Sequence, residues 1–165
     1  MTFSDFLSTL FSGTNLALLG AALAVIMTGI GSAKGVGMVS EAGAGLLAED
    51  PDKFGKAMIL QALPATQGIY GFVVAFLVVF LKLGALSGSL TVLTQSQGMY
   101  ILFACLPIAI GGMVSATKQA RVASAGINVL AKRPEAVGKA IISAALVEMY
   151  AILAFLISIL LVLFF

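Results

Sequence analysis

The sequence predicts an all-α membrane protein with four transmembrane helices, arranged as two tandem parallel helical hairpins. Hydrophobic residues make up 61% of the 165 residues, charged residues only 10%, and the mean hydropathy is +1.14. Four apolar stretches, at residues 14–47, 55–83, 97–130 and 137–165, are each longer than the ~20 residues needed to cross a bilayer. The second half of the chain also repeats the first, which predicts two copies of one hairpin.

The internal repeat emerges when residues 112–165 are laid over residues 29–82 at a constant offset of 83, without a gap. About a third of the positions are then identical; Pro51 meets Pro134, and the tripeptide GKA at 55–57 recurs at 138–140. A unit of two helices returns the chain to its starting side, so the two units are parallel. We therefore expect a first hairpin at residues 1–90 and a second at residues 91–165.

The two helices of each hairpin differ in composition. Spans one and three are rich in small residues, which let helix backbones approach closely, whereas spans two and four carry bulky aromatic residues. We expect a tight inner layer of spans one and three and a wider outer layer of spans two and four, in a ring of identical copies. The alternative is that the small residues only pack the helices of a four-helix monomer. The small residues include Gly29, Gly31, Gly35, Gly37, Gly111, Gly112, Ser115 and Ala116, and the bulky ones Tyr70, Phe72, Phe76, Phe80, Tyr150 and Phe155.

The connections between the spans determine the expected topology. Eight of the nine basic residues lie in or toward the first and third connections, and Lys82 alone lies by the second. By the positive-inside rule, both hairpin loops face the cytoplasm and both termini lie outside, in a multi-pass protein of the cell membrane. This distribution accounts for the net charge of +2, so we expect lipid but no nucleic acid as a partner. The eight residues are Lys34, Lys53, Lys56, Lys118, Arg121, Lys132, Arg133 and Lys139.

The composition offers little for catalysis. The sequence has no His, and Cys105 is the only cysteine, so it holds no pair of thiolates and no nucleophile beside an imidazole base. We expect a protein that is not itself an enzyme.

A single carboxylate, Glu148, interrupts the apolar run SAALVEMYAILAF at residues 143–155. A charged side chain near the middle of a transmembrane helix costs ~2.5–3.5 kcal/mol on insertion scales and usually marks an ion path. Glu148 follows Pro134 by 14 residues, and Thr66, Gln67 and Gln119 lie 15 or 16 residues from the nearest loop proline. At 1.5 Å per residue, all four lie ~21–24 Å from the cytoplasmic loops. The polar residues therefore share one depth.

Span two contributes the largest number of polar groups at this depth. Thr66 and Gln67 lie four and three residues before Tyr70, so all three project onto one side of the helix. Pro64, just before them, has no N–H and obstructs the preceding turn, so the helix must loosen there. We expect the carbonyl of Leu63 to turn inward as a result.

The chemistry of these groups favours a cation site. A buried carboxyl group without partners favours its protonated form, which would suffice for a proton carrier but would not explain the two amides and the hydroxyl. A hard cation prefers oxygen ligands, and the candidate ligands are the oxygens of Glu148, Gln119, Gln67, Thr66 and Leu63. With one Na⁺ they would form a neutral unit, and Tyr70 would hold the carboxylate in place. The amides would otherwise serve only as hydrogen-bonding glue between helices.

Three segments carry a resemblance to a known family: GIGSAKGVGM at 29–38, LPATQGIYGF at 63–72 and VEMYAILAF at 147–155. Together with the duplicated hairpin, they resemble the proteolipid (K- or c-type) rotor-ring subunits of V-type ATPases, most closely those of bacterial sodium-translocating enzymes. The similarity extends from about residue 16 to the end. It implies the same site: Na⁺ at Glu148, Gln119, Gln67, Thr66 and Leu63, with Tyr70 bonded to the carboxylate. Met149 and Lys118 depart from the pattern near the site, where smaller or neutral residues are expected.

The resemblance also implies partners. Identical copies would form the rotor ring, a stator membrane subunit would supply an essential arginine, and central-stalk subunits would dock at the cytoplasmic loops around Pro51 and Pro134. The resemblance leaves open a proton-translocating proteolipid of the same kind of complex. A self-contained channel or transporter is a further alternative, although the small residues close the inner helices together.

Overall fold

The computed structural model describes residues 2–84 and 91–164, and this part of the chain is almost entirely helical. Helices α2 (Gly13–Glu49) and α5 (Gln95–Lys132) are long and continuous. The second span consists of α3 (Phe54–Ala62), α4 (Thr66–Leu77) and a π-helical turn, η3 (Val78–Lys82), and the fourth is α6 (Val137–Leu163). These four units are long and apolar enough to cross a membrane, which confirms the expected fold class.

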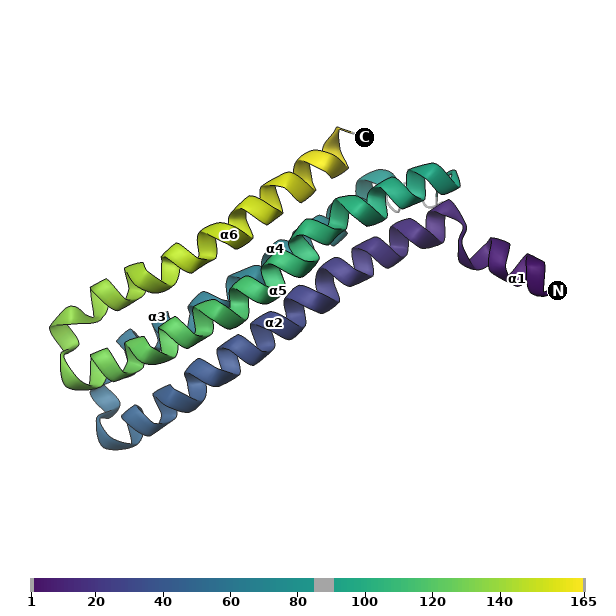
Figure 1. The fold of residues 1–165 in the computed structure, drawn as a ribbon. Helices are drawn as coiled ribbons and strands as arrows, with labels where there is room; N and C mark the ends of the chain where they lie inside the picture. The colour runs from purple at the N-terminus through teal and green to yellow at the C-terminus, as the bar shows by residue number, and fades with distance from the viewer. Residues whose placement is uncertain (1, 85–90, 165) are drawn as a thin grey trace.

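The four spans run side by side, with both termini at one end and both tight loops at the other (Figure 1). The loops are short 3₁₀ turns that begin at a proline, η1 (Pro51–Lys53) and η5 (Pro134–Ala136). Proline is well suited to the first position of a helical turn because the N–H it lacks would have no partner there. The repeated prolines therefore end one helix and begin the next in both hairpins.

A short helix, α1 (Phe3–Leu10), precedes the first span and was not expected from the sequence. It projects from the end of the bundle at an angle to α2 (Figure 1). Thr2 and Asp5 form a reciprocal cap at its start, and the hydrogen bonds from Thr2 to the Asp5 carboxylate hold the pKa of Asp5 below its ordinary value. None of its residues is buried, so tertiary packing contributes little to it.

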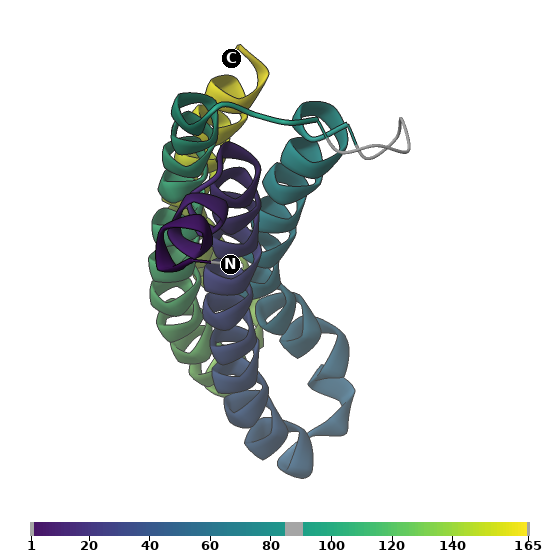
Figure 2. The same ribbon diagram turned by 90° about the vertical axis from the view of Figure 1, so that its right-hand side faces the viewer.

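The inner pair of helices, α2 and α5, approach each other closely along their whole length, and α4 flanks them on one side (Figure 2). A Cβ atom placed on Gly31 would lie 2.7 Å from the Cα of Met113, and one on Gly20 would lie 2.8 Å from the Cα of Leu102. No larger residue fits at either contact, so the small residues of spans one and three do bring these backbones together.

The helices enclose two apolar clusters rather than one continuous core. The cluster nearer the termini includes Ala17, Val74 and Ile108, and the cluster nearer the loops includes Val39, Leu60 and Ile127. Polar side chains of α4, α5 and α6 lie between the two clusters. The polar level is thus flanked by an apolar cluster on the side of the termini and by another on the side of the loops.

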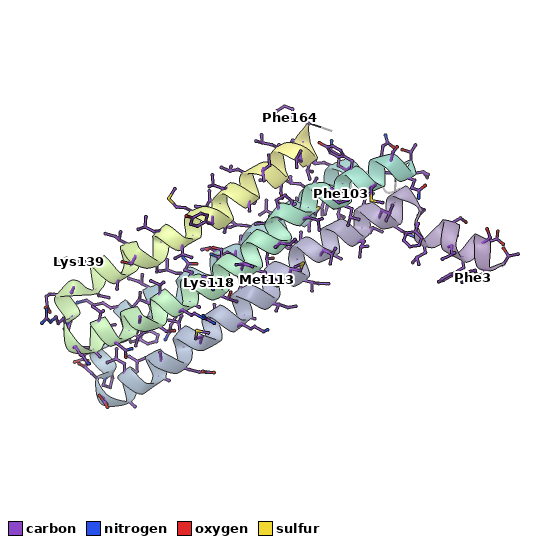
Figure 3. All side chains as sticks on the ribbon, in the orientation of Figure 1. Phe3, Phe103, Met113, Lys118, Lys139 and Phe164 are labelled. Carbon is purple, nitrogen blue, oxygen red and sulfur yellow. The ribbon has the colours of Figure 1, made fainter. Side chains whose placement is uncertain are left out.

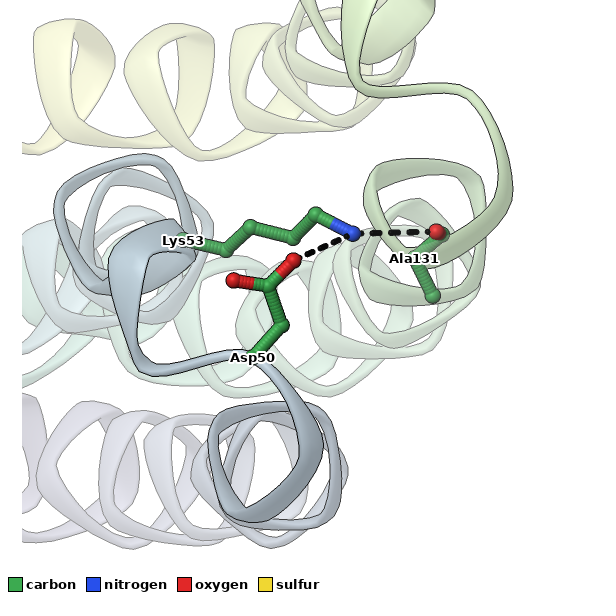
Figure 4. Close-up of polar contacts among 3 residues, drawn as sticks. All are labelled: Asp50, Lys53 and Ala131. Atoms are coloured by element: carbon green, nitrogen blue, oxygen red, sulfur yellow. Dashed lines mark hydrogen bonds and ion pairs between the residues drawn. The ribbon is translucent and has the colours of Figure 1, made fainter.

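A polar contact ties the two hairpins together at the loop end (Figure 4). The Lys53 ammonium group lies 3.0 Å from a carboxylate oxygen of Asp50 and donates a hydrogen bond of 3.1 Å to the carbonyl of Ala131. That carbonyl belongs to the last turn of α5, where helix carbonyls lack partners within the helix. The loop of the first hairpin thus caps a helix of the second.

Candidate functional site

The polar level of the bundle begins at a break in the second span. Between α3 and α4, residues Leu63–Ala65 form a 3₁₀ turn, η2, around Pro64. The carbonyl of Leu63 accepts the backbone N–H of Thr66 and also the Thr66 hydroxyl, at 3.0 Å. The expected loosening at Pro64 is therefore present, and it directs the Leu63 carbonyl and the Thr66 hydroxyl to the same place.

Two glutamine side chains connect α4 to α5. The Gln67 amide donates a hydrogen bond of 2.7 Å to the side-chain oxygen of Gln119, and the Thr66 hydroxyl lies 3.4 Å from the side-chain oxygen of Gln67. Both glutamines have an exposed fraction of 0%. Since a buried amide without partners costs about 1–3 kcal/mol, this pair must be held by its mutual bond and by its neighbours.

The carboxylate of Glu148 completes the network from α6. The Gln119 amide donates to Oε2 of Glu148 at 3.4 Å, and the Tyr70 hydroxyl donates to Oε1 at 2.7 Å. Glu148 is half-buried, and α6 is a continuous helix around it. The tyrosine and the glutamine therefore fix both oxygens of the one carboxylate at this level.

All six residues that the sequence predicts for the site thus lie in one polar cluster formed by three helices of the chain. Hydrogen bonds connect Thr66 to Leu63, and connect Gln67 through Gln119 and Glu148 to Tyr70. The Thr66 hydroxyl, whose one proton goes to the Leu63 carbonyl, lies 3.4 Å from the side-chain oxygen of Gln67. The structure brings together every predicted site residue. It contains one carboxylate, so its oxygens would balance the charge of one monovalent cation.

Sequence reasoning missed the groups that support this chain. The ring of Phe155 stacks on Tyr70 with centroids 4.9 Å apart, which orients the phenol toward Glu148. Ser32 accepts the N–H of Gly68 at 2.8 Å, and Ser115 donates to the carbonyl of Val147 at 3.0 Å. These serines occupy the same position in the two repeats, and each joins an inner helix to an outer one, Ser32 as an acceptor and Ser115 as a donor. The repeat itself therefore carried a signal for them.

A second proline, Pro107, lies inside α5 on the other side of the site, and the helix continues through it. Next to it, the N–H of Ile108 donates to the buried hydroxyl of Ser158, at 3.1 Å. This bond anchors α6 to α5 above the site, as the bond between Ser115 and Val147 anchors it nearby. The position of Glu148 is therefore fixed from two points along α6.

Comparisons with known proteins agree with this architecture. The model of the ATP synthase C-subunit family matches the chain twice, at residues 19–78 and 102–161. The starts of the two matches are 83 residues apart, and so are their ends, which is the offset of the internal repeat. The family unit is thus one helical hairpin, present here in duplicate.

Two relatives extend the likeness over most of the chain. The chain is 54% identical over 159 residues to the V-type sodium ATPase subunit K of Enterococcus hirae, an alignment that covers 96% of this chain and 97% of that protein. It is 41% identical over 147 residues to the A-type ATP synthase subunit K of Methanocaldococcus jannaschii, covering 88% of this chain and 61% of that protein. A duplicated hairpin with one carboxylate at mid-depth, matched twice by the same family model, places this chain in the ATP synthase C-subunit family.

Proposed function

We propose that this chain is the rotor-ring proteolipid of a V-type ATPase, and that it carries Na⁺ across the cell membrane on Glu148 during ATP-driven rotation. The chain is a rotor subunit and not itself the catalyst, so ATP is hydrolysed elsewhere in the complex. The observation that carries the proposal is the cluster of oxygen-bearing groups from Leu63 to Tyr70 that the fold gathers around a single carboxylate. The name of the Enterococcus hirae relative supports sodium as the ion.

The donor set fits a hard monovalent cation. Six oxygen atoms belong to the chain of residues: both of the Glu148 carboxylate, one from each glutamine, the Thr66 hydroxyl and the Leu63 carbonyl. A proton carrier needs only the carboxyl group, whereas a sodium carrier needs neutral oxygens that replace the hydration shell of the ion. Two fully buried amides, of which Gln119 is bonded to the carboxylate and Gln67 to Gln119, therefore favour sodium over a proton.

Loading the ion requires a local rearrangement of the amides. The Gln119 NH₂ group now faces Glu148, where its partial positive charge offsets the carboxylate. A rotation of about half a turn about its last side-chain bond would present the oxygen of Gln119 to the ion instead. The Gln67 amide, which now donates to that oxygen, would have to rotate with it, so that the Gln67 oxygen faces the Gln119 NH₂ group. The Gln119 side chain would thus compensate the carboxylate in one orientation and bind the cation in the other.

The proposed cycle follows from charge balance. Na⁺ enters from a half-channel beside the stator and forms a neutral unit with Glu148, which can then face lipid as the ring turns. An arginine of the stator competes for the carboxylate and releases the ion on the other side. An ion held equally well on both faces would do no work, so coupling requires a difference in affinity between the two half-channels.

The proposed orientation places the loops at Pro51 and Pro134 in the cytoplasm, where central-stalk subunits would dock, and both termini outside. Eight of the nine basic residues lie toward that loop end of the chain, which supports this sidedness. Each chain contributes two hairpins, residues 1–90 and 91–165, and carries one ion.

Labelling of Glu148 with a hydrophobic carbodiimide, with and without Na⁺ at fixed pH, tests the proposal. We expect Na⁺ to protect Glu148 in a concentration-dependent way, because the loaded carboxylate cannot react. The Glu148→Gln variant, which should take no label at this position, identifies the reactive carboxyl group. Labelling that responds to pH but not to Na⁺ would establish a proton carrier instead. Sodium current through the purified ring, without ATP or a stator, would establish a channel.

A further inference from the structure

The short helix α1 receives little packing from the rest of the chain. Isolated helices of fewer than about 12–15 residues are marginal in water, and α1 has eight residues, none of them buried. Phe3, near its start, lies well away from the four spans (Figure 3). The cap at Thr2 and Asp5 defines where the helix begins but buries no apolar area. A surface beyond this chain is therefore needed to pack against α1.

The side chains of α1 divide into an apolar face and a polar face. At 100° per residue, the apolar side chains lie within an arc of about 100°, and the polar ones lie on the opposite side. The apolar residues are Phe3, Phe6, Leu7 and Leu10, and the polar ones are Ser4, Asp5, Ser8 and Thr9. Phe3 is 76% exposed and Leu10 48% exposed. One apolar stripe of this kind fits a flat apolar surface that contacts the helix from one side.

The helix joins the bundle at the edge of a membrane-spanning segment. The apolar run of α2 begins at Leu16, and no charged residue follows until Lys34. Just before that run, the Thr14 hydroxyl donates to the carbonyl of Thr91 at 3.3 Å and accepts the N–H of Leu93 at 3.2 Å. Polar groups of the two hairpins thus meet where the hydrocarbon of a membrane would end, and α1 leaves the bundle at that level.

Hydrogen bonds fix the angle between α1 and α2. The Thr9 carbonyl accepts the backbone N–H of Ser12 at 3.1 Å and the side-chain amide of Asn15 at 2.8 Å. Asn15 belongs to the first turn of α2, so the last turn of α1 is tied to the span. The helix leaves α2 on the side away from α6 (Figure 1). It therefore leaves the helix that carries Glu148 uncovered.

An apolar groove continues the apolar face of α1 onto the span. The groove is about 470 Å³ in volume, and its lining includes Leu10 and Phe11 from the end of α1 and Leu18 and Leu19 from α2. Leu18 and Leu19 lie within the apolar run of α2, at the depth of the hydrocarbon. The groove thus joins the apolar face of α1 to the surface of a membrane-spanning helix.

The charge of α1 indicates the kind of surface that it contacts. Asp5 is the only charged side chain of the helix, and its hydrogen bonds to Thr2 hold its pKa below the ordinary value, so it stays ionised and requires water. No Lys or Arg occurs before Lys34. Helices that bind anionic lipids carry basic residues on the polar face, and α1 carries none. Apolar burial, without attraction to lipid charge, would therefore hold α1 on a membrane.

We propose that α1 is an interfacial helix, which lies in the plane of the membrane at the end of the bundle that holds the termini. Phe3, Phe6 and Leu10 lie among the lipid acyl chains just below the headgroups, and Asp5 faces water. An acyl chain occupies the groove at the junction with α2. The membrane thus supplies the apolar packing that α1 does not find within the chain. This inference depends on the spans crossing a membrane and not on the ion or on rotation.

A single introduced tryptophan tests the placement, because the sequence has none of its own. We expect the full chain of Phe6→Trp, in phosphatidylcholine vesicles, to be quenched by phosphatidylcholine brominated on its acyl chains and little by iodide present on both sides of the membrane. Ser8→Trp, about 200° further around the helix, is the matched control and should show the reverse. The ratio of the two quenching constants should differ at least tenfold between the variants.

A charge on the apolar face tests whether that face makes the contact. In the Phe6→Trp background, Leu7→Glu should reduce quenching by the brominated lipid about fivefold, because a carboxylate is costly among acyl chains. Ser8→Glu adds the same charge on the polar face and should leave the quenching unchanged. Replacing part of the phosphatidylcholine by anionic phosphatidylglycerol should not strengthen the contact, because α1 has no basic residue.

Three results would overturn the interfacial placement. Strong iodide quenching of both tryptophan variants would show that α1 lies in water. Protection of Phe6→Trp from both quenchers would show that α1 packs against protein, such as α1 of another copy. Equal quenching of both variants by brominated lipid would place the whole helix in hydrocarbon. Carbodiimide labelling of Glu148 in the same preparations reports the ion site separately, because Glu148 belongs to α6 and α1 leaves that helix uncovered.

Discussion

The two hairpins of this chain share one backbone plan but divide the polar groups between them. At the position of Glu148 the first hairpin has Ala65, and at the position of Gln119 it has Val36. At the positions of Thr66 and Gln67 the second hairpin has Met149 and Tyr150. Neither hairpin carries the whole set of polar groups, so the candidate site requires both and occurs once per pair of hairpins.

The comparison shows that the two hairpins keep the same arrangement of helices but not the same polar side chains. The glycines, loop prolines and Ser32–Ser115 correspondence keep the helices in the same arrangement in both halves. Gly35 and Gln67 of the first hairpin are buried within the chain, whereas the matching residues of the second hairpin, Lys118 and Tyr150, line an open groove between α5 and α6. Substitutions at the positions where the halves differ should therefore have unequal effects, largest at the carboxylate and smallest at the loops.

Replacing the only carboxylate of the site removes the largest difference between the hairpins. We expect Glu148→Gln to weaken Na⁺ binding about 100-fold or more, because removal of one member of a buried charge pair costs ~3–5 kcal/mol. Binding of radioactive sodium to the purified ring measures this effect. The matched variant Glu148→Ala/Ala65→Glu moves the carboxylate to the first hairpin and should not restore binding; recovery there would contradict the division of roles.

Replacing Gln119 by the residue of the first hairpin tests the neutral ligands. Gln119→Val leaves the Gln67 amide buried without its partner at 2.7 Å and removes one oxygen from the site. We expect sodium protection of Glu148 to require roughly tenfold more Na⁺, since an unpaired buried amide costs about 1–3 kcal/mol. The ring should still assemble. Unchanged protection would show that the amide is only structural.

Removing the Tyr70 hydroxyl tests the support of the carboxylate. Tyr70→Phe loses the 2.7 Å bond to Glu148 but keeps the aromatic stack on Phe155. We expect a loss of sodium affinity of about fivefold, less than for Gln119→Val, because no buried amide is left without a partner. Calorimetric titration of the ring with Na⁺ measures it. Phe155→Leu serves as the control that disturbs the stack and keeps the hydroxyl.

The smallest expected effect concerns the loops. Lys53 pairs with Asp50 and caps α5 at Ala131, whereas the corresponding residue of the second loop is Ala136, which cannot do either. Lys53→Ala should lower the free energy of unfolding by no more than about 1 kcal/mol, since the pair is partly exposed and screened. Proteolysis at the first loop, compared with Lys56→Ala, measures it. If the Lys53→Ala and Lys56→Ala variants were cleaved equally fast, the contacts of Lys53 with Asp50 and Ala131 would have no measurable role in stability.

Much of the fold was predictable because its determinants are local or periodic. The four spans lie within a few residues of the expected bounds, and the loop prolines end the helices in both repeats. The shared depth of Thr66, Gln67, Gln119 and Glu148 followed from counting residues along straight helices, where each residue rises by a fixed amount. The helix α1 was not expected, although Phe3, Phe6, Leu7 and Leu10 follow the i, i+3, i+4, i+7 spacing of an amphipathic helix and Thr2 and Asp5 form a cap at its start.

The sequence by itself determined the helices, their pairing into hairpins, the shared level of the polar groups and the single carboxylate of the candidate site. Only the tertiary structure decided how those groups connect: the Gln67 amide donates to Gln119, the Gln119 amide faces Glu148, and Phe155 and the two serines hold the helices around them. Depth is set by the rise of a helix and can be counted. The direction of a hydrogen bond depends on the rotation and spacing of helices far apart in the sequence, and these are fixed only when their small residues pack together.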